Sequence, residues 1–277
     1  MKRRTFEVST EAPLSQALMS ELGESAEVVG RRVSTGAVYV DGRRVRDVLA
    51  RVATGSLVSV VLEASGASTD QRRTAGDVML EVLFEDGAVL VVNKPPGLPA
   101  QPTPDGERSL LDLATKHLGH DAGLVHRLDR ETSGVTVFGV TKTSTSALAA
   151  AFREGRAKKE YLAVVGPGLP ESGVIDAPLQ KDPSRPGRWR TTSSGNGLEA
   201  STRFECAHRG SVCLVRLFPA TGRTHQLRAH LASIGFPIVG DALYGGAEGP
   251  RCLLHARQLE IDGSRWEAPA PADFPSR

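Results

Sequence analysis

An aspartate between two arginines is the part of this sequence best suited to chemistry. Asp129 lies in the segment Val-His-Arg-Leu-Asp-Arg-Glu-Thr-Ser-Gly, flanked by Arg127 and Arg130. Cations within a few ångströms favour the ionised carboxyl group, so Asp129 is expected to stay charged even when partly buried. An ionised, shielded carboxylate can act as a nucleophile or a base, and the arginines can hold an anionic substrate. By itself, however, the decapeptide favours a structural arginine–aspartate pair.

A second cluster of polar side chains lies about a hundred residues later, in Thr-Gly-Arg-Thr-His-Gln-Leu-Arg-Ala-His-Leu. The pattern predicts a glycine turn followed by a helix, and a helix amino terminus beside arginines is a ready anion site. Arg223 and Arg228 are therefore candidates to bind phosphate or to pair with Asp129. His225 and His230 are five residues apart and do not share a helical face, so no metal site is predicted.

Composition indicates an ordinary soluble globular protein. The chain has 277 residues, 40% hydrophobic and 24% charged, and a net charge of +2, which gives no nucleic-acid signal. Three cysteines (Cys206, Cys213 and Cys252) without C-x-x-C spacing fit a reducing cytosol better than a disulfide framework or a zinc site. No apolar run approaches the length of a membrane span. We expect a cytoplasmic protein with no membrane contact.

Residues 64–76 have the composition of a linker and divide the chain in two. The part before it, residues 1–63, predicts two short helices and a three-stranded sheet that includes a hairpin over 37–45. This pattern is similar to a small RNA-binding module of ribosomal proteins and RNA-modifying enzymes, although Gly55-Ser56 stands where that module has Gly-Asp. Arg43 and Arg44 are candidates to face RNA, or they belong to a solvated charged face.

The part after the linker, residues 77–265, predicts strands mixed with helices. Strands are expected over 78–84, 88–92, 135–140 and 159–165, and helices over 109–114 and 144–154. The order lacks a regular βαβ rhythm, which favours an α+β fold with a mixed, largely antiparallel central sheet and flanking helices. Residues 181–197 are expected to be a polar loop and 266–277 a Pro-rich tail, neither of them catalytic.

Five motifs in a fixed order together resemble the RluA-like family of pseudouridine synthases, over roughly residues 79–260. They are Asn93-Lys94-Pro95-x-Gly97, His126-Arg127-Leu128-Asp129-Arg130-x-Thr132-Ser133-Gly134, Lys159-x-Tyr161, Thr221-Gly222-Arg223-Thr224-His225-Gln226-Leu227-Arg228 and Pro237-Ile238-x-Gly240-Asp241-x-x-Tyr244-Gly245. The last of these is interpreted as packing and turn chemistry. The motif begins with histidine (His-Arg-Leu-Asp) and not with glycine (Gly-Arg-Leu-Asp), which favours this branch over the sister branch that acts on the small ribosomal subunit.

The resemblance implies an enzyme that isomerises uridine in RNA, breaking the N1–C1′ bond, turning the base and rejoining it through C5. No cofactor or metal is implied, and the chain has no P-loop or dinucleotide-binding glycine pattern. Asp129 matches the catalytic aspartate, as nucleophile or as base. Arg223 matches the arginine that pairs with it, and Tyr161 matches the tyrosine that stacks on the target base and could assist proton loss at C5.

The remaining matched positions are interpreted as RNA contacts or as support. A uridine must leave its stack to reach a pocket carboxylate, and Arg127 matches the residue that fills the space left behind. Further RNA-binding candidates in the catalytic part are Arg130, Lys159, His225 and Arg228. Of the other side chains, Arg130 also anchors its loop, His126 is interpreted as packing and His255 as structural.

Two other functions fit these residues less well than an isomerase. A catalytically silent RNA-binding or ribosome-assembly factor would have no chemical need for Asp129, Tyr161 and Arg223 together. A hydrolase using Asp129 with His126 or His225 lacks a serine or cysteine nucleophile in a suitable turn. As the partner we expect RNA, with large-subunit ribosomal RNA favoured over tRNA because of the N-terminal module. The protein is expected to be a monomer.

Overall fold

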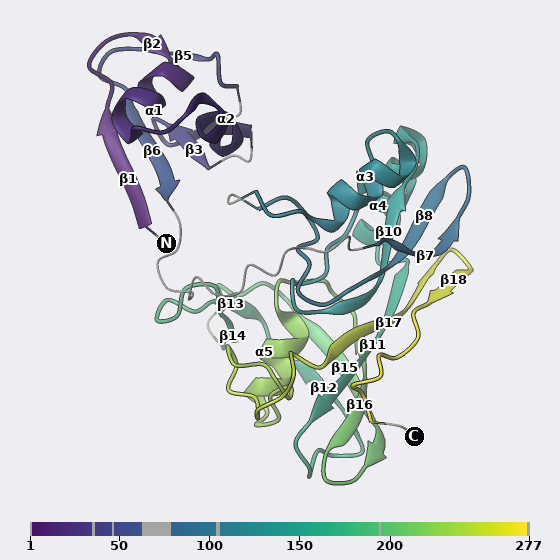
Figure 1. Ribbon diagram of the computed structural model, residues 1–277. Coiled ribbons are helices and arrows are strands. Elements are labelled where there is room, and N and C mark those ends of the chain that lie inside the picture. The colour runs from purple at the N-terminus through teal and green to yellow at the C-terminus, as the bar shows by residue number, and fades with distance from the viewer. Residues whose placement is uncertain are drawn as a thin grey trace. The chain divides into compact units, whose positions relative to one another are not determined.

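The computed structural model describes residues 2–34, 37–45, 47–62, 79–103, 106–193 and 195–275. It divides into an N-terminal unit and a larger C-terminal unit, the latter formed by residues 80–100 and 110–277 (Figure 1). The linker expected over 64–76 lies outside the described residues. Within the described ranges, no helix has both the length and the apolar character needed to cross a membrane.

The N-terminal unit packs two helices on an antiparallel sheet. The helices are α1 (Leu14–Leu22) and α2 (Ala26–Ser34), and the sheet has the order β1 (Lys2–Glu7), β6 (Leu57–Leu62), β3 (Val38–Val40), β4 (Arg43–Val45). A short pair, β2 (Ala12–Pro13) with β5 (Arg51–Val52), lies beside them. Asp41 and Gly42 both have positive φ, as a tight two-residue hairpin turn requires.

The expected hairpin of this unit is confirmed, and one strand was not expected. β1 pairs along its whole length with β6, which makes a fourth strand. Its sequence, Lys-Arg-Arg-Thr-Phe-Glu, is too charged to stand out as a strand. The strand is nevertheless stabilised because its Phe6 packs against the core that contains Leu14, Leu18 and Val58.

The C-terminal unit is built on one long sheet, as the sequence predicts. Its strand order is β12-β15-β16-β11-β17-β10-β8-β7, with β18 paired to β17 and β9 paired to β10. Every pairing is antiparallel except that of β10 with β17. The strands on this path are β12 (Ser172–Asp176), β15 (Ser201–Arg209), β16 (Cys213–Pro219), β11 (Ala157–Val165), β17 (Leu254–Ile261), β10 (Ser133–Gly139), β8 (Val89–Lys94) and β7 (Glu81–Glu85).

Helices lie at both ends of this sheet (Figure 1). α3 (Leu110–Leu118) and α4 (Lys142–Arg153) lie near β8 and β10, whereas α5 (Gln226–Ser233) lies at the other end, beside the hairpin of β13 (Leu179–Lys181) and β14 (Trp189–Thr191). α4 begins with a capping box between Thr141 and Ser144. The remaining strands are β9 (Gly123–Leu124) and β18 (Ser264–Glu267).

Two segments expected to lack regular structure are partly ordered. The predicted loop over 181–197 contains β14, which pairs with β13. The predicted tail over 266–277 begins inside β18, and its Phe274 is buried against the main core. Both were missed because proline and glycine dominate their composition, although short paired strands tolerate these residues at their ends.

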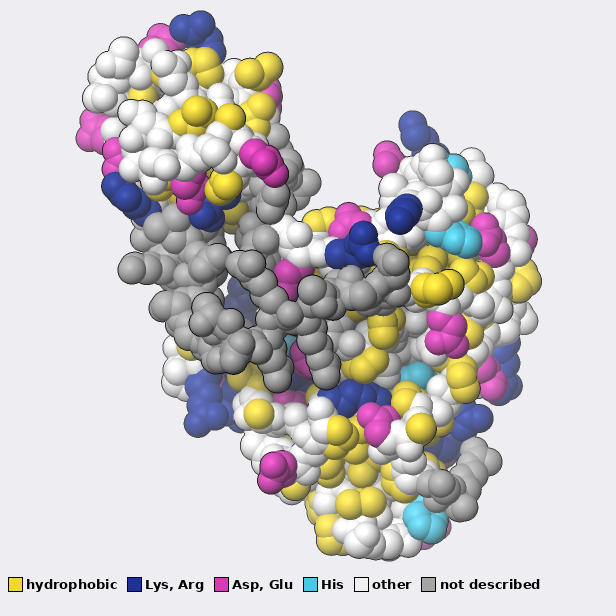
Figure 2. Space-filling model, viewed as in Figure 1, with side chains coloured by type: hydrophobic (Ala, Val, Ile, Leu, Met, Phe, Trp, Pro, Cys, Tyr) yellow, Lys and Arg dark blue, Asp and Glu magenta, His cyan; other side chains and the backbone are white. Residues whose placement is uncertain are grey.

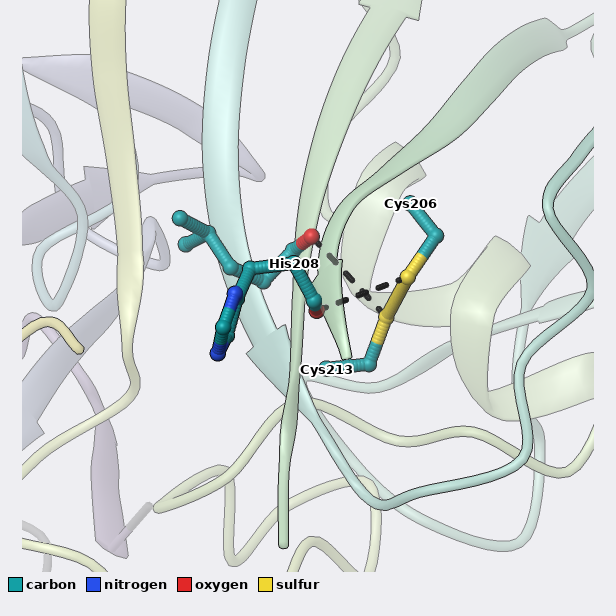
Figure 3. Close-up of a disulfide and its surroundings, with 4 residues drawn as sticks. Cys206, His208 and Cys213 are labelled. Carbon is teal, nitrogen blue, oxygen red and sulfur yellow. Dashed lines mark hydrogen bonds between the residues drawn. A yellow bond between two sulfur atoms is a disulfide. The ribbon is translucent and has the colours of Figure 1, made fainter. Parts of the chain in front are cut away.

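A disulfide joins Cys206 of β15 to Cys213 of β16, with their Cα atoms 6.5 Å apart (Figure 3). The register of the two strands shifts between Cys206 and His208, and this bulge brings two cysteines that are not direct partners within bridging distance. The expectation that the cysteines form no disulfide is therefore wrong. Their spacing of seven residues could not show that the two flanking segments form a hairpin.

Candidate active site

The loop that carries Asp129 is held in place through its backbone. The carbonyl oxygen of Arg130 accepts hydrogen bonds from the backbone N–H of Gly97 and from Lys94 Nζ, both at 2.9 Å. Lys94 is fully buried at the end of β8, and its ammonium also donates to the carbonyl oxygens of Pro95 and Leu98. Burial lowers the pKa of Lys94 to about 7. One side chain thus connects the Asn-Lys-Pro loop to the aspartate loop.

The aspartate loop enters β10 through a position that only glycine can occupy. Gly134 has φ +116°, and a Cβ atom there would lie 2.1 Å from the carbonyl oxygen of Ala256 in β17. Next to it, the Ser133 hydroxyl and His255 Nδ1 are 2.9 Å apart in the core. These contacts fix where the loop leaves the sheet, and with it the position of Asp129.

Arg228 of α5 is the arginine that reaches Asp129. Its Nη1 lies 3.5 Å from the Asp129 carboxylate, while its Nε and Nη2 donate to both oxygens of Asp241 at 2.7 and 2.8 Å. The Arg228 and Asp241 side chains are almost fully buried, whereas Asp129 keeps 25% of its side chain exposed. Burial opposes the charge on Arg228, but Asp241 and then Asp129 outweigh it and raise the pKa of Arg228 above its usual value.

The expected pairing of Arg223 with Asp129 is therefore wrong. Arg223 is exposed, and its Nε donates to the carbonyl oxygen of Glu199 at 3.0 Å. The sequence offered two arginines on either side of His225, one in the turn and one in the first turn of α5. Only the helical one points toward the aspartate loop, and residue spacing alone does not reveal that direction.

His225 also lies near Oδ2 of Asp129, the oxygen that Arg228 approaches. Its Nε2 is 3.9 Å from Asp129 Oδ2, and its Nδ1 is 3.1 Å from the hydroxyl oxygen of Tyr244. That hydroxyl also accepts a hydrogen bond from the backbone N–H of Trp189. The carboxylate beside Nε2 favours the ring hydrogen on that nitrogen, so Nδ1 accepts from Tyr244. Burial lowers the pKa of His225, and the Asp129 charge opposes this only partly.

The backbone of His225 is strained. Its φ of +55° lies in the left-handed region at the start of α5, where few residues other than glycine, asparagine and aspartate are found. Strain of this kind costs about 1–3 kcal/mol and is most often found at functional sites. Here it turns the imidazole back toward Asp129.

Tyr161 and Lys159 occupy the same face of β11, because side chains alternate along a strand. Burial, reinforced by the negative charge of Asp129, raises the pKa of Tyr161 well above its usual value, so the phenol stays protonated. Lys159 donates from Nζ to the carbonyl oxygen of Thr221 at 3.1 Å and so connects β11 to the turn before α5. Burial lowers the pKa of Lys159.

The remaining side chains of the aspartate loop separate into support and surface. His126 Nε2 accepts a hydrogen bond from the backbone N–H of Val137, and its ring stacks on Phe152 at 4.6 Å, which confirms the packing interpretation. Burial lowers the pKa of His126 to about 3. Arg127 is exposed. Arg130 is also half-exposed and has Glu131 3.9 Å away, so the anchoring of the loop comes from its carbonyl group.

The start of α5 is positioned by two buried polar side chains. Gln226 accepts from the Thr221 hydroxyl at 2.6 Å and from the Arg223 backbone N–H at 3.0 Å, and its amide donates to Ser201 and Thr202. His230 Nδ1 lies 2.9 Å from the Thr202 hydroxyl. His230 is therefore a structural residue of β15–α5 packing.

Sequence reasoning missed the roles of Asp241 and Tyr244. Their motif was interpreted as a packing turn, yet both residues contact the groups that surround Asp129. A lone aspartate in an apolar, glycine-rich segment was the available signal, since a buried carboxylate needs a cationic partner. The side chains of Arg43 and Arg44 lie outside the described residues.

The arrangement provides one partly exposed carboxylate, with a guanidinium and an imidazole near its Oδ2 atom and a protonated phenol close by. Within the described ranges, no three histidine, cysteine or acidic side chains gather to hold a metal ion. Such a carboxylate can attack an electrophilic carbon or remove a proton.

Comparisons with known proteins show the family of this chain. Residues 88–233 match the family model described as RNA pseudouridylate synthase. A ribosomal large subunit pseudouridine synthase D of Nitrosomonas europaea is 34% identical over 240 residues, which cover 78% of this chain and 69% of that protein. The dual-specificity RNA pseudouridine synthase RluA of Escherichia coli K12 is 39% identical over 210 residues, covering 70% of this chain and 94% of that one.

Solved structures agree. The structure named human RNA pseudouridylate synthase domain containing 1 superposes with a TM-score of 0.61 at 26% identity, over 71% of this chain and 84% of that one. A family model that spans more than half of the chain, and relatives above 30% identity over most of their length, show that this chain belongs to the RNA pseudouridylate synthase family and is an RluA-like RNA pseudouridine synthase.

Proposed function

We propose that the enzyme isomerises specific uridines of large-subunit ribosomal RNA to pseudouridine. Support for this target comes from the relatives named ribosomal large subunit pseudouridine synthase D and from the N-terminal unit, whose sequence is similar to RNA-binding modules of ribosomal proteins. The alternative is the same chemistry on tRNA. The relative named a dual-specificity RNA pseudouridine synthase supports this alternative.

The observation that carries the proposal is the position of Asp129. We assign the catalytic carboxylate to this residue because it is partly exposed while its cationic neighbour, Arg228, is nearly buried. Acting as nucleophile at C1′ or as base on the sugar, Asp129 promotes cleavage of the N1–C1′ bond. After the base has turned and rejoined through C5, N1 carries a proton and C5 loses one, so the reaction is an isomerisation overall.

We assign Tyr161 to contact with the uracil ring and not to removal of a proton. Its raised pKa keeps the phenol protonated, so it is a poor general base near neutral pH. A ring on the β11 face close to Asp129 can instead pack against the uracil during its rotation. The C5 proton then goes to a carboxylate, and Asp129 is the half-exposed one at this place.

The RNA contacts are proposed from exposure and charge. Arg127, directly before Leu128 and Asp129, is exposed and is assigned to the space that the flipped uridine leaves. Arg223, which does not pair with Asp129, and Arg130 are assigned to contacts with phosphates of the RNA backbone. Lys159, His225 and Arg228, first considered as RNA contacts, have their described partners inside the protein and are assigned to support.

We expect the enzyme to work as a monomer in the cytoplasm. A reducing compartment would convert the Cys206–Cys213 disulfide to thiols.

The decisive experiment maps pseudouridines in total RNA from cells with and without the protein. Loss of a pseudouridine from large-subunit ribosomal RNA is expected, whereas loss from tRNA alone would establish the alternative. In vitro, Asp129→Asn should abolish tritium release from RNA that carries C5-tritiated uridine and leave RNA binding largely intact. Turnover of this variant at the wild-type rate would show that the catalytic residue is misassigned.

A non-catalytic RNA-binding factor predicts a different pair of results. In that case the pseudouridine maps would be identical with and without the protein, and wild-type protein would release no tritium. The conservative change of Asp129 would then have no measurable effect.

A further inference from the structure

The hairpin of β13 and β14 concentrates positive charge on a short, well-ordered segment. Between Leu179 and Thr191 it has four cationic residues, Lys181, Arg185, Arg188 and Arg190, and one acidic residue, Asp182. Elsewhere the visible face of the molecule mixes cationic with acidic side chains (Figure 2). The hairpin is therefore a local departure from a chain that is nearly neutral overall.

One face of the hairpin is attached to the element that holds the active site. Leu179 is fully buried with Ala229 of α5 and Tyr244, and Trp189 packs against the same cluster. The Trp189 backbone N–H donates to the Tyr244 hydroxyl at 3.0 Å, and that hydroxyl contacts His225 beside Asp129. The hairpin is thus separated from the reacting carboxylate by two side chains.

The tip of the hairpin is rigid. Asp182 accepts from the Ser184 hydroxyl and backbone N–H at 2.7 and 3.0 Å, and the backbone N–H of Asp182 donates to the carbonyl oxygen of Arg188. Such an aspartate turn fixes the directions of the residues that follow it. A polyanion that binds here meets side chains whose backbone is already ordered.

Two cations of the hairpin have no side-chain partner among the described residues, while the exposed Arg190 has the Gln180 amide 3.1 Å from its Nη2. The side chains of Lys181 and Arg185 are exposed and make no hydrogen bond or ion pair with any other described residue, although their backbones take part in the hairpin. Arg188 lies 5.3 Å from the Tyr244 ring, its Nε is buried without an acceptor among described residues, and Asp182 is 3.9 Å away. The exposed side chains of Lys181 and Arg185 are therefore the ones suited to an external anion.

We propose that this hairpin is an RNA-backbone contact next to the active site, with Lys181, Arg185 and Arg190 binding phosphates on the strand that leads into it. The inference rests on the proposed function only in taking RNA as the partner. Phosphate contacts position the nucleic acid without reading its sequence. The hairpin should therefore determine affinity and the placement of the substrate strand, not the choice of uridine.

The test compares a charge-removing variant with a matched control. Arg185→Ala/Arg190→Ala removes two exposed hairpin cations, whereas Arg153→Ala/Lys158→Ala removes two exposed cations from α4 and from the side of β11 opposite Tyr161. Binding to RNA from cells lacking the enzyme, fractionated into ribosomal RNA and tRNA, is measured between about 50 and 200 mM salt. Turnover is measured on C5-tritiated RNA.

For the hairpin variant we expect KM and Kd to rise roughly tenfold and the salt dependence of log Kd to decrease by about 1.5–2, since each phosphate contact contributes close to one unit. kcat should be unchanged, and Arg185→Lys/Arg190→Lys should restore binding. The control pair should match wild type. Unchanged affinity and salt dependence in the hairpin variant, or a loss of kcat with unfolding, would overturn the proposal. Absence of turnover in wild type that still shows the binding difference would instead contradict the proposed function.

Discussion

At the scale of single residues, the site depends on one guanidinium shared by two carboxylates. Arg228 is held by the buried Asp241 on one side and presents Nη1 to Asp129 on the other. Asp241 therefore positions Arg228 without touching the substrate. The arrangement keeps the charge of Asp129 balanced while leaving its carboxylate partly exposed.

Removing Asp241 should affect stability and turnover together. Asp241→Ala leaves Arg228 buried without its bidentate partner, which should lower the free energy of unfolding by about 3–5 kcal/mol. kcat should fall more than KM changes, because Arg228 is no longer directed at Asp129. The measurements are urea unfolding and tritium release over a range of RNA concentrations.

A matched control is Asp273→Ala, which removes the more exposed bidentate partner of Arg251. Its cost should be about 1 kcal/mol or less, with no effect on kcat. If the two variants lost stability and activity to the same extent, the special role of Asp241 would be refuted.

The sequence identified the residue types of the site better than their contacts. Asp129 and Tyr161 were predicted and lie close enough for the aspartate to influence the tyrosine pKa. Arg223 was predicted as the ion-pair partner, but Arg228 has that place. Arg223 lies in the turn before α5 and Arg228 in its first turn, and their spacing alone does not show which of them faces Asp129.

At the scale of elements, the strands that were predicted are those with continuous apolar runs. β8, β10 and β11 are central and read clearly as buried strands. β15 was not predicted because its exposed positions carry arginine, glutamate and histidine, so that its hydrophobic signal is weak. The pairing of β15 with β16 stabilises the strand although its own sequence has a weak preference for one.

The disulfide between β15 and β16 should contribute to stability but not to catalysis. It lies at the turn end of the pair, whereas Thr202, which contacts Gln226 and His230, lies at the opposite end. Closing so short a loop restricts the unfolded chain by about 2–3 kcal/mol. Reduction, or Cys206→Ser/Cys213→Ser, should lower the free energy of unfolding by that amount and leave kcat unchanged.

Urea unfolding with and without reductant, together with thiol counting by mass spectrometry, checks this. The buried Cys252 serves as the internal control because it should be unreactive in the native protein in both states. A fall in kcat on reduction would show that the strand end near α5 depends on the disulfide after all.

At the scale of the whole molecule, several buried histidines are held uncharged. Burial lowers the pKa of His126 to about 3 and that of His255 to about 4. In the unfolded chain a histidine titrates near pH 6.5. Between these values the unfolded state binds more protons, so stability is complete above about pH 6.5 and is lost as the pH falls.

Each of the two histidines should therefore lower the free energy of unfolding by on the order of 1.4 kcal/mol per pH unit between about pH 6.5 and pH 4. Urea unfolding at several pH values measures the slope. His255→Gln should reduce this slope by about 1.4 kcal/mol per pH unit, the contribution of one proton. His120→Gln, which changes an exposed ring, should leave the slope unchanged. Equal slopes in all three proteins would contradict the assignment.

The sheet order also bears on how the protein is made. β17 lies between β11 and β10, so Ser133, four residues after Asp129, pairs with His255, which is synthesised more than a hundred residues later. A chain still emerging from the ribosome can place Asp129, Tyr161 and Arg228 in sequence but cannot bring them together until residues 254–261 have been released. The nascent chain is therefore expected to have no isomerase activity until β17 has taken its place between β10 and β11.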